Sequence, residues 1–360
     1  MTASLVRRVL PAALCSFADF FGLSAVVPLI PFHLSGDGAE LEAAVQWSGA
    51  INSIQYVGVV LGCIFWGYTS DRIGAMRTLR ITIVGDVIFF AATTAVTKPQ
   101  PLLVVRVLAG FFSPLVPAAA YIFEVTDAEE AVKATGANAF AIALGYGLGT
   151  ACIGLYEVIG WVGVGSLASL VALLASLSTM PCCTAIPGGH DPSRSSQERA
   201  KPSGVAAALR SGNFLSQAAS ASALMFYFIG AQSILVIDLL ERFEFSATRV
   251  SLVYVMAPSG YVVSILLAPT LTAKFGLQPL VTCGMAVVAG CCSLLAIPAV
   301  STQLPVLLGL WALATLGFSF AILPAQARAK LIGVHQTTNG TGSITGTSRV
   351  IQSCGQVRES

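Results

Sequence analysis

The chain has 360 residues, of which 55% are hydrophobic and only 10% are charged. An ordinary soluble domain carries roughly 25% charged residues, so this composition excludes a soluble globular protein and predicts one that crosses a membrane several times. The formal net charge is +2, and the basic residues are scattered singly, which excludes a nucleic-acid-binding surface. Eight of the nine cysteines fall within or at the ends of apolar runs, where they pack as small hydrophobic residues, and no spacing suits a metal.

Ten apolar runs, each about the length of a membrane-spanning helix, follow one another along the chain. They cover residues 9–32, 47–66, 79–96, a run after Pro101 that ends at 123, 137–159, 162–186, 214–237, 250–272, 280–299 and 304–324. The polar segment 187–213 is rich in Pro, Gly, Ser and both charge signs, which is typical of a flexible linker. The sequence therefore predicts a bundle of six helices over 1–186, a cytoplasmic linker over 187–213, and a second, incomplete bundle over 214–360.

Positive charge predicts the orientation in the membrane, because Lys and Arg concentrate in cytoplasmic loops. With the N-terminus inside, the inner segments hold thirteen Lys and Arg and the outer loops hold three, Lys98, Arg242 and Arg249. We therefore expect the N-terminus and the central linker to be cytoplasmic.

A charged, glycine-containing segment separates the second and third runs. It reads Gly67-Tyr-Thr-Ser-Asp71-Arg72-Ile-Gly74-Ala-Met-Arg77 and predicts a tight cytoplasmic turn. The pattern resembles the signature loop of the major facilitator superfamily of secondary transporters, with Ala75-Met76 departing from that family's usual basic run. The resemblance implies an all-α, two-bundle fold with six helices in the first half and about four to five in the second.

The same pattern recurs, in weaker form, after the eighth run. Pro269-Thr-Leu-Thr-Ala-Lys-Phe-Gly276 aligns with residues 67–74, so that Arg72 matches Lys274 and Gly74 matches Gly276, whereas Ala273 stands where the first copy has Asp71. This spacing indicates two related halves.

Three charged residues lie inside apolar runs, where charge is costly and indicates function. Asp19 lies about 15 Å from the inner end of the first run at 1.5 Å per residue, Asp86 about 10 Å from the inner face, and Arg106 about 8 Å from the outer face. The alternatives are a neutral structural carboxyl for each aspartate and, for Arg106, a side chain that reaches the outer headgroups.

The context of Asp19, followed by Phe20-Phe21-Gly22, resembles the first helix of the drug:proton antiporter and vesicular amine transporter branches. There a membrane aspartate binds a proton or a cationic substrate. Arg106-Val-Leu-Ala-Gly110 resembles the family's fourth-helix motif, and we expect Arg106 to favour proton release from Asp19 while Gly110 admits a close neighbour.

Glu124 resembles the acid that ends the family's fourth helix and is a candidate latch partner of Arg72 or Arg77; an ordinary surface glutamate is the alternative. Gly145 and Gly149 lie in the fifth run at the place of the antiporters' Gly-Pro motif, but without its proline. Close helix packing and a transport hinge both remain open for them.

After the tenth run the chain begins what resembles the family's eleventh helix near Asn339, but no apolar body follows. We therefore expect a chain truncated by nearly two helices. In that case Asp71 lacks the facing helix that it would otherwise contact.

The sequence predicts a transporter rather than an enzyme, without metal or cofactor, acting as a monomer in a lipid bilayer on a small molecule and protons. The preferred function is proton-coupled export by alternating access. An uncoupled facilitator or symporter of a metabolite is the first alternative, and a non-transporting receptor or scaffold is the second. The substrate, the coupling ion and the particular membrane are not encoded in any motif.

Overall fold

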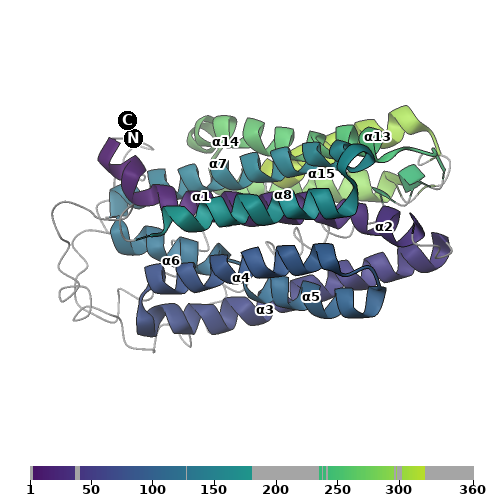
Figure 1. The fold of residues 1–360 in the computed structure, drawn as a ribbon. Helices are drawn as coiled ribbons and strands as arrows, with labels where there is room; N and C mark the ends of the chain where they lie inside the picture. The colour runs from purple at the N-terminus through teal and green to yellow at the C-terminus, as the bar shows by residue number, and fades with distance from the viewer. Residues whose placement is uncertain are drawn as a thin grey trace. The chain divides into compact units, whose positions relative to one another are not determined.

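The computed structural model describes residues 3–36, 41–126, 128–180, 235–236, 238–240, 242–295, 297 and 302–320. Within these residues every regular element is a helix (Figure 1), which confirms the predicted all-α fold. The predicted linker at 187–213, most of the predicted span at 214–237, and the segment around Asn339 lie outside the described residues.

Long apolar runs form long helices, because only a helix satisfies its own backbone groups inside a bilayer. The elements are α1 (Ala3–Val26), η1 (Val27–Leu29), α2 (Ile30–Gly36), α3 (Leu41–Ile73), α4 (Ala75–Ala95), α5 (Pro99–Phe111), α6 (Leu115–Val125), α7 (Ala128–Cys152), η2 (Ile153–Leu155), α8 (Tyr156–Ser178), α13 (Ala247–Tyr254), α14 (Met256–Phe275), α15 (Leu277–Leu295) and a further helix over Leu304–Phe320.

Five described stretches are long and apolar enough to cross a membrane: Ala3–Ser35, Gln46–Ile73, Ala75–Ala95, Pro99–Val125 and Lys133–Ser178. One crossing takes about 20 residues. The 46 residues of the last stretch therefore contain two crossings, α7 and α8.

Two predicted helix boundaries are wrong. The fourth run is two helices rather than one, because Pro114 lacks a backbone N–H and disfavours a helical conformation at Ser113, so α5 ends at Phe111 and α6 begins at Leu115. The fifth run ends at η2 rather than at residue 159. The chain then reverses by way of Gly160, whose φ of 66° favours glycine.

A single glycine joins two helices at each of the predicted repeat positions. Gly74 separates α3 from α4 with φ 92°, and Gly276 separates α14 from α15 with φ 83°. A side chain is strained at these φ values, which explains why both copies carry glycine. The backbone therefore agrees with the predicted repeat at this point.

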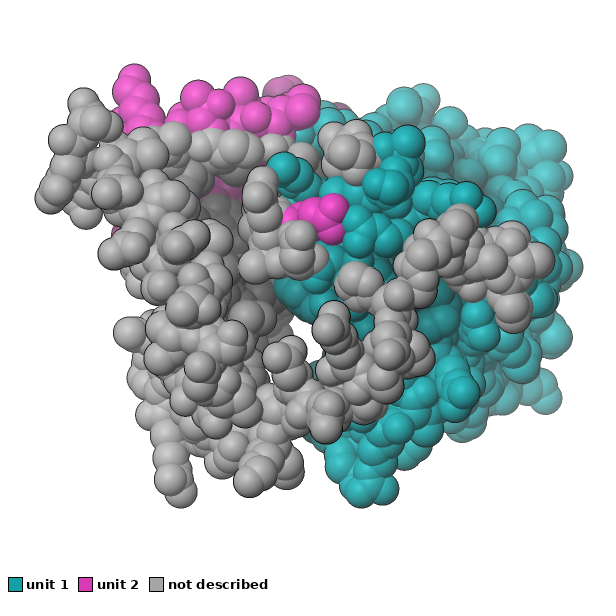
Figure 2. All heavy atoms as spheres, turned by 90° about the vertical axis from the view of Figure 1, so that its left-hand side faces the viewer, with its two compact units in different colours: residues 1–126, 133–185, 232–262 teal, residues 127–132, 186–231, 263–360 magenta. Residues whose placement is uncertain are grey.

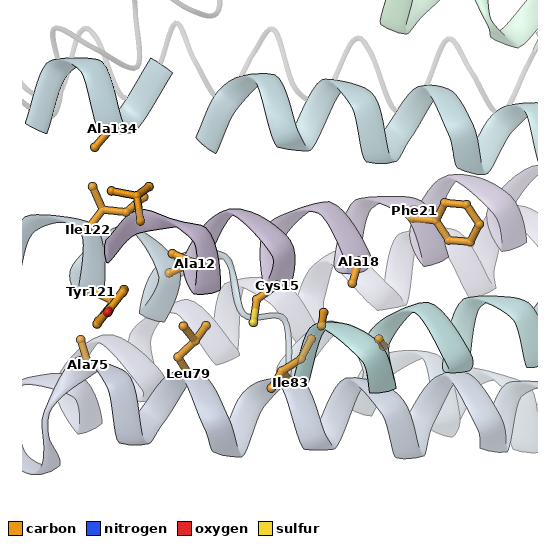
Figure 3. Close-up of a cluster of buried hydrophobic side chains, with 14 of the residues drawn as sticks. Ala12, Cys15, Ala18, Phe21, Ala75, Leu79, Ile83, Tyr121, Ile122 and Ala134 are labelled. Atoms are coloured by element: carbon orange, nitrogen blue, oxygen red, sulfur yellow. The ribbon is translucent and has the colours of Figure 1, made fainter. Parts of the chain in front are cut away.

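Small and medium side chains build the main core (Figure 3). Ala12, Cys15 and Ala18 of α1 lie among residues of α4, including Leu79 and Ile83. Small residues let helix backbones approach closely, which is the usual way helices associate where no water is present.

The chain divides into two compact units, coloured separately in Figure 2. The first comprises 1–126, 133–185 and 232–262, and the second comprises 127–132, 186–231 and 263–360. All three charged residues predicted inside the membrane belong to the first unit.

Candidate functional site: a buried acid and arginine cluster

Four helices of the first unit each contribute a polar side chain to one buried cluster. Asp19 comes from α1, Gln55 from α3, Asp86 from α4 and Arg106 from α5. Arg106 is fully buried, Asp86 is 1% exposed and Asp19 is 9% exposed. The charges of the two aspartates and of Arg106 act on one another. The structure therefore brings together all three predicted membrane charges.

Asp19 accepts one hydrogen bond, from a residue that the sequence analysis did not single out. The Ser113 hydroxyl donates to Asp19 Oδ2 at 2.7 Å. Ser113 lies in the break between α5 and α6, where Pro114 frees it from the helix. A Ser-Pro pair inside an apolar run was the available signal, because such a pair predicts a helix break.

Arg106 donates from Nη2 to the side-chain oxygen of Gln55. In the described part of the chain its Nε and Nη1 atoms have no hydrogen-bond acceptor, and no acid lies within ion-pair distance. Full burial means that Arg106 does not reach the headgroups, which was the alternative to a functional role. Three of its five donors remain on the unpaired Nε and Nη1 atoms, so it is equipped to bind an anion or a carboxylate that approaches it.

Asp86 is the least satisfied member of the cluster. Both of its carboxyl oxygens are buried and lack a hydrogen-bond partner among the described residues. Tyr56 and Cys15 complete the surroundings, since the charges of the cluster act on both side chains.

Most of the signature loop is helical. Gly67, Asp71 and Arg72 lie in the last turns of α3, and only Gly74 leaves the helical conformation before α4 begins. The Arg72 guanidinium lies over the Tyr68 ring, 4.2 Å from its centroid. Among described residues, neither Arg72 nor Arg77 forms an ion pair with Glu124.

The Glu124 side chain, from the end of α6, instead contacts the first residue of α4. Its Oε2 accepts the backbone N–H of Ala75 at 3.2 Å, so the carboxylate meets the positive end of that helix. Two arginines bind the C-terminal ends of helices. Arg8 donates to the Val125 carbonyl at the end of α6 at 2.6 Å, and Arg80 donates to the Thr179 carbonyl just after α8 at 2.7 Å. The predicted latch role of Glu124 stays a prediction.

The glycines singled out from the sequence lie where helix backbones approach most closely. A methyl group at Gly145 would overlap the Phe17 carbonyl, one at Gly149 would overlap the Phe21 carbonyl, and one at Gly110 would overlap the Gln55 carbonyl. These positions admit no side chain without backbone movement. A hinge role for Gly145 and Gly149 is not tested by this geometry.

The polar and aromatic residues of the predicted second half are only partly described. Tyr254 is buried in the first unit. In the second unit Trp311 is 1% exposed, and its indole N–H has no acceptor in the described part of that unit. Tyr227 and Gln232 lie outside the described residues. No group of three His, Cys, Asp or Glu able to hold a metal occurs within the described ranges.

Several membrane-crossing helices around a buried charge cluster define an integral, multi-pass membrane protein. Residues 10–354 match the family model of the Major Facilitator Superfamily, so the chain belongs to that superfamily. A 70-residue stretch is 33% identical to "Putative metabolite transport protein YaaU" of Escherichia coli (strain K12), covering 19% of this chain and 16% of that protein.

Solved structures share the fold. A D-xylose-proton symporter is 18% identical over 96% of this chain and 90% of its own, with a TM-score of 0.66. The xylose transporter XylE from E. coli, in a partially occluded inward-open conformation, is 17% identical over 93% of this chain and 89% of its own, with a TM-score of 0.66. A bacterial homolog of the human lysosomal transporter Spinster is 16% identical over 94% and 78%, at 0.63.

Proposed function

We propose that this protein is a secondary transporter that exports a small organic solute by alternating access, coupled to protons through Asp19. The observation that carries the proposal is the position of Asp19: it lies in a membrane helix, within the electrostatic reach of a fully buried arginine that forms no ion pair with a described acid. Such a carboxyl can exchange a proton for a cation. A structural carboxyl would instead form an ion pair and would not be available to bind either one.

Arg106 has the role of a counter-charge in this proposal. Burial disfavours the ionised form of Asp19, whereas the hydrogen bond donated by the Ser113 hydroxyl and the positive charge of Arg106 both favour it. A cationic solute arriving at Asp19 would displace the proton, and a proton arriving from the other side would displace the solute. The similarity of the Asp19 context to the first helix of the antiporter branches supports this direction.

A proton symporter of a neutral metabolite is the second candidate. The printed names of two similar proteins, a D-xylose-proton symporter and a metabolite transport protein, favour it. A facilitator without coupling and a non-transporting receptor are the remaining alternatives.

Flux into proteoliposomes separates these candidates. Ethidium serves as the organic-cation probe and D-xylose as the neutral probe, with the pH gradient imposed in either direction. An antiporter accumulates its probe when the lumen is acidic, and a symporter does so when the outside is acidic. A facilitator ignores the gradient. No flux of either probe under any gradient would count against the proposal.

A further inference from the structure

The carboxyl of Asp86, which has no hydrogen-bond partner among the described residues, bears on which acid of the cluster is protonated. An ionised carboxylate needs hydrogen-bond donors or a cation when it leaves water. Asp86 is 1% exposed, and neither of its oxygens has a donor among the described residues. Its helix therefore presents a carboxyl whose surroundings suit the neutral form.

The groups around Asp86 contain one positive charge for two acids. Titratable side chains come from four of the helices packed against α4, and the fifth, α8, has none beyond its first turn. Those that interact with the charges of the cluster are Cys15 and Asp19 of α1, Tyr56 and Cys63 of α3, and Arg106 of α5. The α6 side chains Tyr121 and Glu124 lie outside the cluster, because Glu124 meets the start of α4 at Ala75, about 16 Å along the helix from Asp86. With both aspartates ionised the cluster would carry a net charge of −1, and one bound proton makes it neutral.

Hydrogen bonding decides which aspartate takes that proton. Asp19 accepts the Ser113 hydroxyl at 2.7 Å, and the Leu115 N–H, 3.5 Å from Ser113 Oγ, donates to that oxygen and orients the hydroxyl hydrogen toward Asp19. A donor of this kind stabilises a carboxylate. Asp86 has no equivalent donor in the part of the chain that the structure describes, so the proton is better placed there.

We propose that Asp86 is a positioning residue that holds a proton at neutral pH and so leaves Asp19 as the ionised acid opposite Arg106. The charge state stands on the geometry alone, whereas its use in coupling rests on the proposed function. A neutral Asp86 leaves the single negative charge of the cluster on Asp19, where a cation can meet it. If Asp86 ionised, it would compete with Asp19 for Arg106 and for an incoming cation.

Infrared spectroscopy of the full-length protein in lipid tests the charge state without any substrate. A buried protonated carboxyl gives a C=O band at neutral pH, and exposed acids do not. We expect the band in the wild-type protein, its loss in Asp86→Asn, and its displacement in Asp86→Glu. Asp238→Asn, which alters an acid paired with Arg242 outside the cluster, serves as the matched control and should keep the band.

A band that persists in Asp86→Asn, or the absence of a band from the wild-type protein, would overturn the inference. Asn resembles the neutral acid in shape, so Asp86→Asn should fold, and the displacement of the band in Asp86→Glu decides the question even if it does not. Ethidium flux gives a second readout: the wild-type flux should fall at alkaline pH as Asp86 ionises, and this alkaline fall should be absent in Asp86→Asn. Absence of flux in the wild-type protein would sink the proposed function and leave the infrared result to decide the charge state.

Discussion

Arg106 is the residue whose environment departs furthest from what its chemistry requires. A guanidinium is permanently charged and carries five donors, yet in the described structure it has one hydrogen bond, to Gln55, and no ion pair. An interior cation left in this way is a strong indication of function, because a structural arginine would be surrounded by acceptors. The acids that its charge reaches are Asp19 and Asp86.

Replacing Arg106 with Ala should move the pH profile of transport to higher pH. Loss of the positive charge makes both aspartates bind protons more tightly, so release at Asp19 needs a more alkaline medium. Flux in proteoliposomes at a series of symmetric pH values measures this shift. Arg106→Lys keeps the charge and should shift the profile less, and an unmoved profile in Arg106→Ala would contradict the counter-charge role.

Replacing Ser113 with Ala should shift the same profile in the same direction. The hydroxyl donates to a buried carboxylate, and a hydrogen bond to a charged group contributes about 1.5–3 kcal/mol, or roughly one to two pH units. Ser113→Thr retains the hydroxyl and is the matched control. Equal profiles for Ser113→Ala and Ser113→Thr would show that this hydrogen bond has no part in coupling.

The sequence predicts some of these residues and not others, for a physical reason. Asp19, Asp86 and Arg106 are visible because charge within an apolar run is rare. Their partners Gln55 and Ser113 are ordinary polar residues, and only the packing of α3 against α5 and of α6 against α1 brings them to the charges. A hydrogen-bond partner from another helix leaves no local pattern.

At the level of elements, close packing between α1 and α7 depends on the absence of side chains. The backbone carbonyls of Phe17 and Phe21 occupy the space where Gly145 and Gly149 would carry a Cβ. Backbone atoms cannot move aside as a flexible side chain can, so these two glycines fix the approach of the helices.

Gly145→Ala should lower the thermal stability of the purified protein. Forcing a methyl group into a filled contact costs about 1–3 kcal/mol. Gly136→Ala is the control, since it lies on the same helix with nothing within 4 Å of the added atom, and alanine favours a helix by about 1 kcal/mol over glycine. The melting temperature should fall for Gly145→Ala and hold or rise for Gly136→Ala. The opposite order would contradict the packing described here.

A second contact between elements joins the first turn of α8 to the first turn of α13. The Glu157 carboxylate accepts the N–H of Thr248 in the first turn of α13 at 3.3 Å, and Ala247 beside it is buried. Negative charge is favourable at a helix N-terminus. The predicted topology places this contact on the outer side of the membrane.

Glu157→Gln should loosen the start of α13, because the amide oxygen keeps the hydrogen bond but loses the charge. Maleimide labelling of a cysteine at position 247, in a cysteine-free background, measures the exposure of this site. We expect faster labelling in Glu157→Gln than in the parent. A control cysteine at the exposed Leu252 should label at the same rate in both, and no difference at position 247 would contradict a capping role.

For the whole molecule, the fold was largely predictable because a bilayer permits few structures. Apolar runs of about 20 residues must be helices, and the matched glycines at 74 and 276 follow from two helices meeting at one residue. The breaks at Ser113 and at residues 153–155 were missed, because a hydropathy average over about 20 residues does not change at one serine or within an apolar Ile-Gly-Leu segment. The break at Ser113 matters for the proposed site, since it frees the hydroxyl that donates to Asp19.

The central claim is that Asp19 couples transport to protons. Ethidium accumulation in proteoliposomes with an acidic lumen, compared between the wild-type protein and Asp19→Asn, tests it most directly. Gradient-driven accumulation is expected in the wild-type protein and in the control Asp238→Asn, and it should disappear in Asp19→Asn while the protein remains folded. Accumulation by Asp19→Asn equal to that of the wild-type protein would contradict the claim.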